Sequence, residues 1–214
     1  MLNSGLAIYQ SSTLETKPFV YMLLLANGLE RFMKVLLVLQ NLEAKKTGLT
    51  NKELKALGHD LIKCRDQVLA KYYSDNFKRR GDSKADLDFL TNDTGVMELF
   101  EILNKFANGD RYLFLDATAK PDELRREWPA RRWDALEQKG VDIKEFTDPK
   151  KQTVLRKLVI TNVVTLLERI IRAFSRLLFS DALTDPLAKS LTTWVKNFVM
   201  LDDADVGKTS YKIQ

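Results

Sequence analysis

Residues 19–46 read FVYMLLLANGLERFMKVLLVLQNLEAKK, and this stretch decides the fold. Its apolar side chains recur at helical spacing and cover most of the helix circumference, which predicts a long helix buried in a core. One narrow polar stripe remains, made of Asn27, Glu30 and Lys34 with Arg31 beside them. Helical spacing places these groups on neighbouring positions of one face, where water or a partner helix can meet them.

A second apolar helix is predicted from Val154 to Ser180. It carries Arg169, Arg172 and Arg176 on one side, and we interpret them as a solvated face, with a phosphate-binding row or a dimer interface as alternatives. Two long apolar helices cannot bury their surfaces alone. Together with several shorter helices, they predict an all-α helical bundle made of one domain over residues 1–214.

Shorter helices are predicted between and after the two long ones. Thr50 and Glu53 match a capping box, which predicts a helix that runs to about Lys78. Two short helices are expected over about 83–107, and an amphipathic helix over about 187–201.

The two ends of the chain carry weak helical signals. Residues 1 to about 17 are largely polar and end at Pro18, which suits the first turn of the next helix, so we expect a loose arm. The last amphipathic helix is followed by Asp202–Asp203–Ala204–Asp205, and the residues after these are expected to be frayed.

The segment Arg111 to Leu115 is the only one whose composition favours a strand, although an isolated strand would have nothing to pair with. Residues 116–150 mix proline, tryptophan and dense charge, which indicates a long connection containing a short helix. Arginines and tryptophan there could bind phosphates and stack on bases. The nucleic-acid candidates are Arg125, Arg126, Trp128, Arg131 and Arg132. We favour the alternative that Trp128 and Trp133 dock this segment on the bundle while the arginines face water.

Composition excludes several classes of protein. The 214 residues are 45% hydrophobic and 29% charged, as in ordinary globular proteins. The single cysteine, Cys64, cannot form an intramolecular disulfide, and no secretory signal is recognised at the N-terminus, so a cytoplasmic location is expected. No uncharged run approaches the roughly 20 residues of a membrane span. A net charge of +5 permits an anionic partner without requiring one.

Metal and cofactor chemistry finds little support. His59 is the only histidine, and Cys64 lies five residues later, which rotates it by about 140° on a helix. Residues 206–210 include the Gly-Lys-Thr end of a phosphate loop, but Asp202 stands where the first glycine should be and no strand precedes it. The pairs Asp86/Asp88 and Asp202/Asp203 resemble solvated carboxylates. We therefore expect no metal site and no cofactor.

The segment Gly58–His59–Asp60–Leu61, preceded by a long helix that carries Asn27–Gly28–Leu29–Glu30 and Lys34, resembles the HEPN superfamily of helical nucleotide- and RNA-associated domains. The resemblance covers about residues 19–115 and includes an Arg-Tyr pair, Arg111–Tyr112. It implies a helical domain with an RNA or nucleotide ligand.

HEPN ribonucleases typically carry an arginine, then four to six intervening residues, and then the histidine. In this chain Leu54, Glu53 and Lys52 occupy those positions, so the arginine is missing. Lysine keeps the charge at one of them but lacks the planar fork that grips phosphate oxygens. The resemblance therefore implies a binding domain more than a nuclease.

The leading hypothesis is a noncatalytic HEPN-like module that binds an anionic ligand, RNA or a protein partner. Its candidate ligand-binding residues are Asn27, Glu30, Lys34, His59, Lys63 and Arg111. The alternative is a metal-independent ribonuclease that uses His59, with a second histidine supplied across a homodimer. A purely structural role leaves His59 hydrogen-bonded to Glu30 or a carbonyl, with Asp60 compensating the helix dipole. An oligomerising protein built on the 154–180 helix is a third class.

Overall fold

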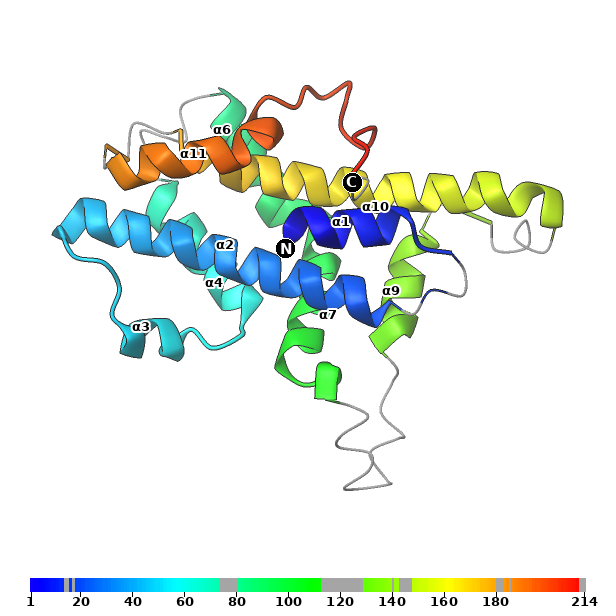
Figure 1. The fold of residues 1–214 in the computed structure, drawn as a ribbon, viewed down its shortest axis with the longest axis horizontal. Coiled ribbons are helices and arrows are strands. Elements are labelled where there is room, and N and C mark those ends of the chain that lie inside the picture. The colour runs from blue at the N-terminus through cyan, green and yellow to red at the C-terminus, as the bar shows by residue number, and fades with distance from the viewer. Residues whose placement is uncertain are drawn as a thin grey trace.

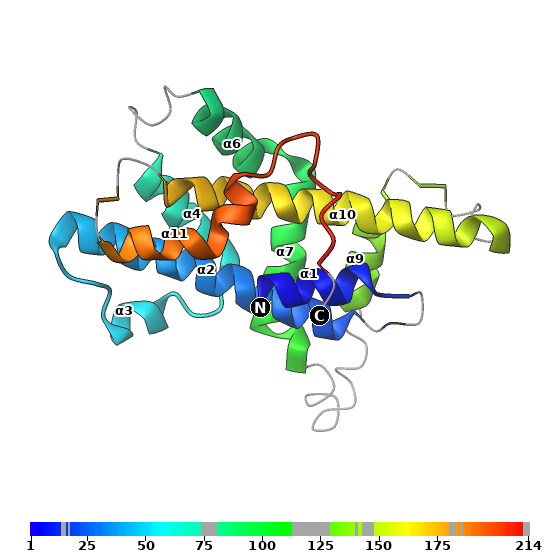
Figure 2. The ribbon, with the colours of Figure 1, turned by 45° about the horizontal axis from the view of Figure 1, so that its top comes forward.

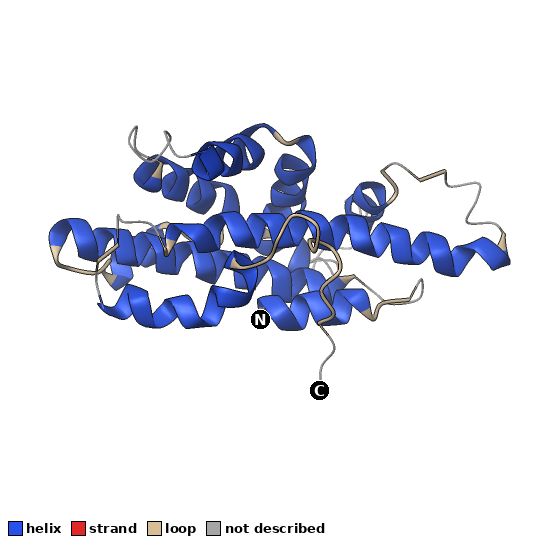
Figure 3. Ribbon diagram, turned by 90° about the horizontal axis from the view of Figure 1, so that it is seen from above, coloured by secondary structure: helices blue, strands red, loops and turns tan. Residues whose placement is uncertain are grey.

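The fold is described from a computed structural model. It describes residues 1–13, 16, 18–73, 81–112, 129–139, 141–142, 148–179, 183–184 and 186–211. Over these ranges every regular element is a helix and none is a strand (Figure 3). The predicted all-α helical bundle is confirmed. None of the described helices combines the length and apolar character that a membrane crossing requires.

Two long helices organise the bundle, as predicted: α2 (Phe19–Lys45) and α10 (Pro149–Leu177). Figure 1 shows them running along the length of the molecule, with shorter elements above, between and below them. The shorter elements are α1 (Leu2–Gln10), α3 (Asn51–Ala56), α4 (Leu61–Tyr72), α6 (Gly81–Asn92), α7 (Thr94–Asn108), the 3-10 helix η1 (Asp110–Tyr112), α9 (Pro129–Glu137) and α11 (Pro186–Val199).

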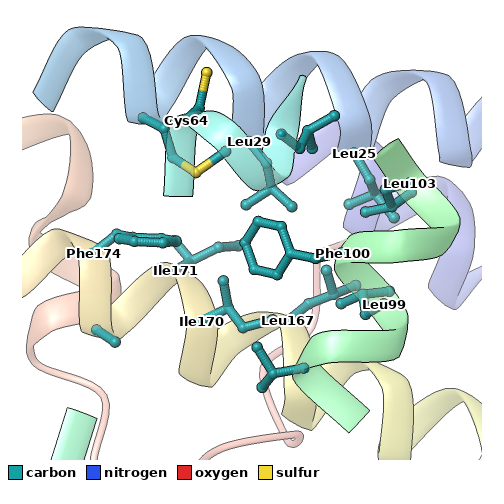
Figure 4. Packing of buried hydrophobic residues seen from close by; sticks show 14 of the residues in the cluster. Leu25, Leu29, Cys64, Leu99, Phe100, Leu103, Leu167, Ile170, Ile171 and Phe174 are labelled. Carbon is teal, nitrogen blue, oxygen red and sulfur yellow. The ribbon is translucent and has the colours of Figure 1, made fainter. Parts of the chain in front are cut away.

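The core lies where α7 passes between α2 and α10. Phe100 of α7 is fully buried, and Figure 4 shows its ring between Leu29 of α2 and Ile170 of α10. The ring of Phe174 meets it edge to face, with centroids 6.4 Å apart. Burying each large apolar side chain of this kind stabilises the fold by about 1.5–3 kcal/mol.

The N-terminal residues were predicted to be a loose arm, and that prediction is wrong. They form α1, which packs along α2 with Leu6 and Tyr9 fully buried. The two helices approach closely because Gly28 faces α1, and a Cβ on Gly28 would lie 2.7 Å from the Leu2 side chain. Polar residues between the apolar positions of α1 hide its helical pattern in the sequence.

The helix expected to run from Thr50 to about Lys78 is broken in two. The capping box at its start is confirmed, since the Glu53 N–H donates to Thr50 Oγ1 and the Thr50 N–H donates to Glu53 Oε2. α3 then ends before Gly58, which has a φ of +59° and turns the chain. α4 begins after Asp60, whose carboxylate accepts the Lys63 N–H at 2.8 Å.

The segment after α7, whose composition favours a strand, begins with a short helix instead. Residues 110–112 form η1, and residues 113–115 lie outside the described residues. The short helix expected within 116–150 is α9, and its Trp133 is fully buried against Tyr9 and Tyr21. The interpretation that Trp133 docks this segment on the bundle is confirmed.

Candidate functional site

The polar stripe of α2 meets the turn between α3 and α4. His59 Nδ1 lies 3.0 Å from Glu30 Oε2, while Lys34 Nζ donates to Glu30 Oε1 at 2.7 Å. The same ammonium group donates to the Gly58 carbonyl at 2.6 Å. We call Glu30, Lys34, Gly58 and His59 the His59 cluster. Three of the predicted ligand-binding residues are therefore brought together.

The charges of the His59 cluster largely satisfy one another. Burial acts to raise the pKa of Glu30, but hydrogen bonds from Lys34 and His59 outweigh burial and lower it. The carboxylate is thus ionised at neutral pH. The His59 side chain is 51% exposed while that of Glu30 is only 8% exposed. With Nδ1 against the carboxylate, Nε2 is the ring nitrogen that an incoming ligand can reach.

The other predicted ligand-binding residues are Asn27, Lys63 and Arg111, and none of them is a hydrogen-bond partner of the cluster. Lys63 is exposed, and its ammonium group donates to the Ala56 carbonyl at the end of α3. Arg111 stacks over the Tyr112 ring, 4.7 Å from guanidinium carbon to ring centroid. Asn27 is half-buried on α2, and no hydrogen bond within the described chain ties it to His59.

Only two of the five nucleic-acid candidates lie within the described residues. Arg125, Arg126 and Trp128 lie outside the described residues. Arg131 is exposed on α9 and Arg132 is half-buried there. α9 packs on α7 and α10, and its Trp133 ring meets Tyr9 of α1 and Tyr21 of α2. Neither Arg131 nor Arg132 is a hydrogen-bond partner of the His59 cluster.

The arginines of α10 were interpreted as a solvated row, and this interpretation is wrong. Arg172 is buried and donates to the Leu201 carbonyl and to the carboxylate of Asp203. Arg176 donates to both carboxylate oxygens of Asp86, at 3.0 and 3.1 Å. These arginines fasten α6 and the C-terminal segment to α10.

The carboxylates that meet these arginines are not alike. Asp86 is buried, and burial raises its pKa although Arg176 acts in the opposite direction. The interpretation of Asp86 as a solvated carboxylate is therefore wrong. Among the described residues Arg169 makes no such ion pair. Its guanidinium carbon lies 3.8 Å from the ring centroid of Phe89.

The residues after Asp205 were expected to be frayed, but those as far as Tyr211 are docked. The Gly207 N–H donates to Glu168 Oε2 at 2.5 Å, and the Tyr211 hydroxyl donates to Glu168 Oε1 at 2.7 Å. Gln10 of α1 accepts the Tyr211 N–H and donates to the Thr209 carbonyl. In Figure 2 this segment, in red, crosses α10 and ends beside α1.

A hollow of about 1370 Å³ lies where α1, α10 and residues 207–210 meet. We call it the α1–α10 hollow. Its lining residues are mostly hydroxyl and amide side chains, together with three cations. These cations are Arg156, Lys157 and Lys208, and no carboxylate is among the described lining residues. The sequence contains one signal for it, the Gly-Lys-Thr at 207–209, which lacks the context of a phosphate loop.

Comparison with known proteins does not extend these observations. No protein-family model, no curated protein and no solved structure matches this chain. The resemblance to the HEPN superfamily therefore stays a prediction.

Within the described residues, no three His, Cys, Asp or Glu side chains are grouped as a metal site would require. Cys64 is buried in the core, and burial raises the pKa of its thiol to about 11. A thiol with that pKa is protonated at neutral pH, and it is a poor nucleophile and metal ligand.

Replacing Glu30 with glutamine is expected to lower the free energy of unfolding by about 1–2 kcal/mol at pH 7, because Lys34 and His59 lose an ionised acceptor. The pKa of Glu30 is lowered from an ordinary value of 4.5, so its contribution is present above that pH and is lost as pH falls through the lowered pKa. Urea unfolding between pH 3 and 7 measures this. The exposed Glu101→Gln is the control, and equal pH profiles for both variants would contradict the expectation.

Proposed function

We propose that this chain is a noncatalytic helical binding module whose surface around His59 binds an anionic ligand, with RNA as the ligand class. The observation that supports this most directly is the half-exposed His59, held at Nδ1 by buried Glu30 so that Nε2 is accessible. A side chain whose orientation is fixed before binding loses less entropy when a ligand arrives.

Cationic and polar groups near His59 suit phosphate and sugar contacts. Lys63 is exposed in the first turn of α4, and Asn108 of α7 donates to the His59 carbonyl. Lys34 adds a second positive charge, although Glu30 partly neutralises it. Contacts of this kind position a nucleic acid without reading its sequence.

Catalysis finds less support than binding at this surface. RNA cleavage needs a base for the 2′-hydroxyl, an acid for the leaving oxygen and a cation for the phosphorane. The cluster holds one histidine, and its Lys34 ammonium already donates to Glu30 and the Gly58 carbonyl. The cation is thus directed inward, away from an incoming phosphate.

One observation favours the second candidate, a metal-independent ribonuclease. A carboxylate beside Nδ1 orients an imidazole and supports its action as a general base through Nε2, and Glu30 stands in that relation to His59. This candidate requires a homodimer that brings two copies of His59 together.

The test uses structured and single-stranded RNAs at low and moderate salt, with binding and cleavage followed together. We expect salt-sensitive binding without cleavage, weakened about tenfold or more in the double variant His59→Ala/Lys63→Ala. Lys189→Ala removes an exposed charge on α11 and should leave binding nearly unchanged. Equal binding by the double variant would contradict the proposal, whereas cleavage that disappears with His59→Ala would favour the ribonuclease.

A further inference from the structure

We propose that the α1–α10 hollow is a second binding site, and that it takes a small organic ligand carrying a phosphate group. This site is separate from the His59 surface and does not rest on the RNA-binding proposal. The argument uses its charge, its hydrogen-bond donors, its volume and the way its walls are held.

The charge of the hollow is positive and incompletely paired. Lys157 of α10 and Lys208 of the C-terminal segment are both exposed, and neither has an ion-pair partner within the described chain. Arg156, the third cation, pairs with Glu137 at 2.6 Å. Two ammonium groups are therefore left to meet a negatively charged ligand, and ammonium groups bind phosphate well as point charges.

Donors for phosphate oxygens lie between these cations. The Ser12 hydroxyl accepts a hydrogen bond from Arg156 Nη2 at 2.6 Å, so its own proton is free to be donated. Further hydroxyls line the same space. They belong to Thr153, Thr161, Thr209 and Ser210. Arg156 also keeps a buried Nε without a partner in the described chain.

The volume of the hollow leaves room for a ligand larger than an inorganic ion. About 1370 Å³ exceeds the roughly 300–1,000 Å³ of typical small-molecule sites, so an organic group fits beside the phosphate. Ala7 and Ile160 supply apolar lining for that group.

The walls are fixed before any ligand arrives. Gln10 binds Thr209 and Tyr211 through both ends of its amide, and buried Glu168 accepts from the Gly207 N–H. The Gly207 N–H is thus directed at a carboxylate and not into the hollow. The site therefore differs from a phosphate loop, in which backbone N–H groups cradle the ligand. Its recognition depends on side chains.

Calorimetric titration with inorganic pyrophosphate and with ATP, without added metal and at low ionic strength, tests the proposal. We expect saturable binding that weakens about tenfold or more in the double variant Lys157→Gln/Lys208→Gln. The matched control Lys189→Gln/Lys196→Gln removes two exposed lysines of α11 and should bind as the original chain does. His59→Ala should also leave this binding unchanged, which separates the two sites.

Hydrogen–deuterium exchange gives a second readout that needs no variant. Bound pyrophosphate or ATP should slow amide exchange in residues 10–13 and 205–211, and leave exchange around His59 as it was. The proposal is overturned if neither probe binds saturably, if the control variant weakens binding as much as the double variant does, or if the slowed amides lie elsewhere.

Discussion

Replacing Trp133 with alanine is expected to lower the free energy of unfolding by about 3–5 kcal/mol. Trp133 is fully buried, and its ring centroid lies 5.4 Å from that of Tyr9 and 5.2 Å from that of Tyr21. Its removal opens a cavity at the place where α9 meets α1 and α2. Urea denaturation followed by far-UV circular dichroism measures the loss.

A matched variant separates packing from hydrogen bonding at this position. Trp133→Phe keeps an aromatic ring but removes the indole N–H, which donates to Glu137 Oε1 at 2.8 Å. We expect it to cost about 1–3 kcal/mol, less than alanine does. If alanine costs no more than phenylalanine, the ring does not pack as described.

Replacing Gly207 with alanine is expected to release the C-terminal segment and to cost about 2–4 kcal/mol. A Cβ at this position would lie 2.1 Å from Thr165 Oγ1, and the φ of +84° disfavours any side chain. Hydrogen–deuterium exchange of the amides of residues 207–211 should accelerate. Pyrophosphate binding should weaken as well, because residues 207–210 line the α1–α10 hollow.

Two further variants test whether the destabilisation by Gly207→Ala arises because the C-terminal segment lies so close to α10. Gly58 also has a positive φ, of +59°, but nothing lies within 4 Å of an added Cβ, so Gly58→Ala should cost about 1–2 kcal/mol. Thr165→Ala removes the oxygen that the new methyl group meets, and the double variant Gly207→Ala/Thr165→Ala should regain part of the lost protection. If the double variant regains no protection, the destabilisation comes from the positive φ of residue 207 alone and not from the contact with Thr165.

The two long helices could be predicted because the spacing of their apolar residues is enough, without knowledge of any partner, to indicate a buried helix. Residues 19–46 expose so little polar surface that only a core helix suits them, and the structure has α2 at Phe19–Lys45. The capping box at Thr50 is equally local, since its two partners lie three residues apart. Within the His59 cluster, the contact between His59 and Glu30 was foreseen as a structural alternative.

The features that sequence reasoning missed depend on distant partners. Arg172 resembles a surface residue until Asp203 and the Leu201 carbonyl meet it, and Gln10 gives no sign that Thr209 will be its partner. The break at Gly58 is different, because it requires a backbone conformation that glycine permits and does not compel. The α1–α10 hollow could not be predicted because three parts of the chain that are distant in the sequence build it.

The bridge from Gln10 to Thr209 and Tyr211 also sets an order of assembly during synthesis. It joins residues 199 and 201 positions apart, so it cannot form until nearly all of the described chain has left the ribosome. α1, α2 and most of α10 can collapse earlier. The third wall of the α1–α10 hollow is therefore added last, and a nascent chain that ends before Gly207 would have a folded core without a completed binding site.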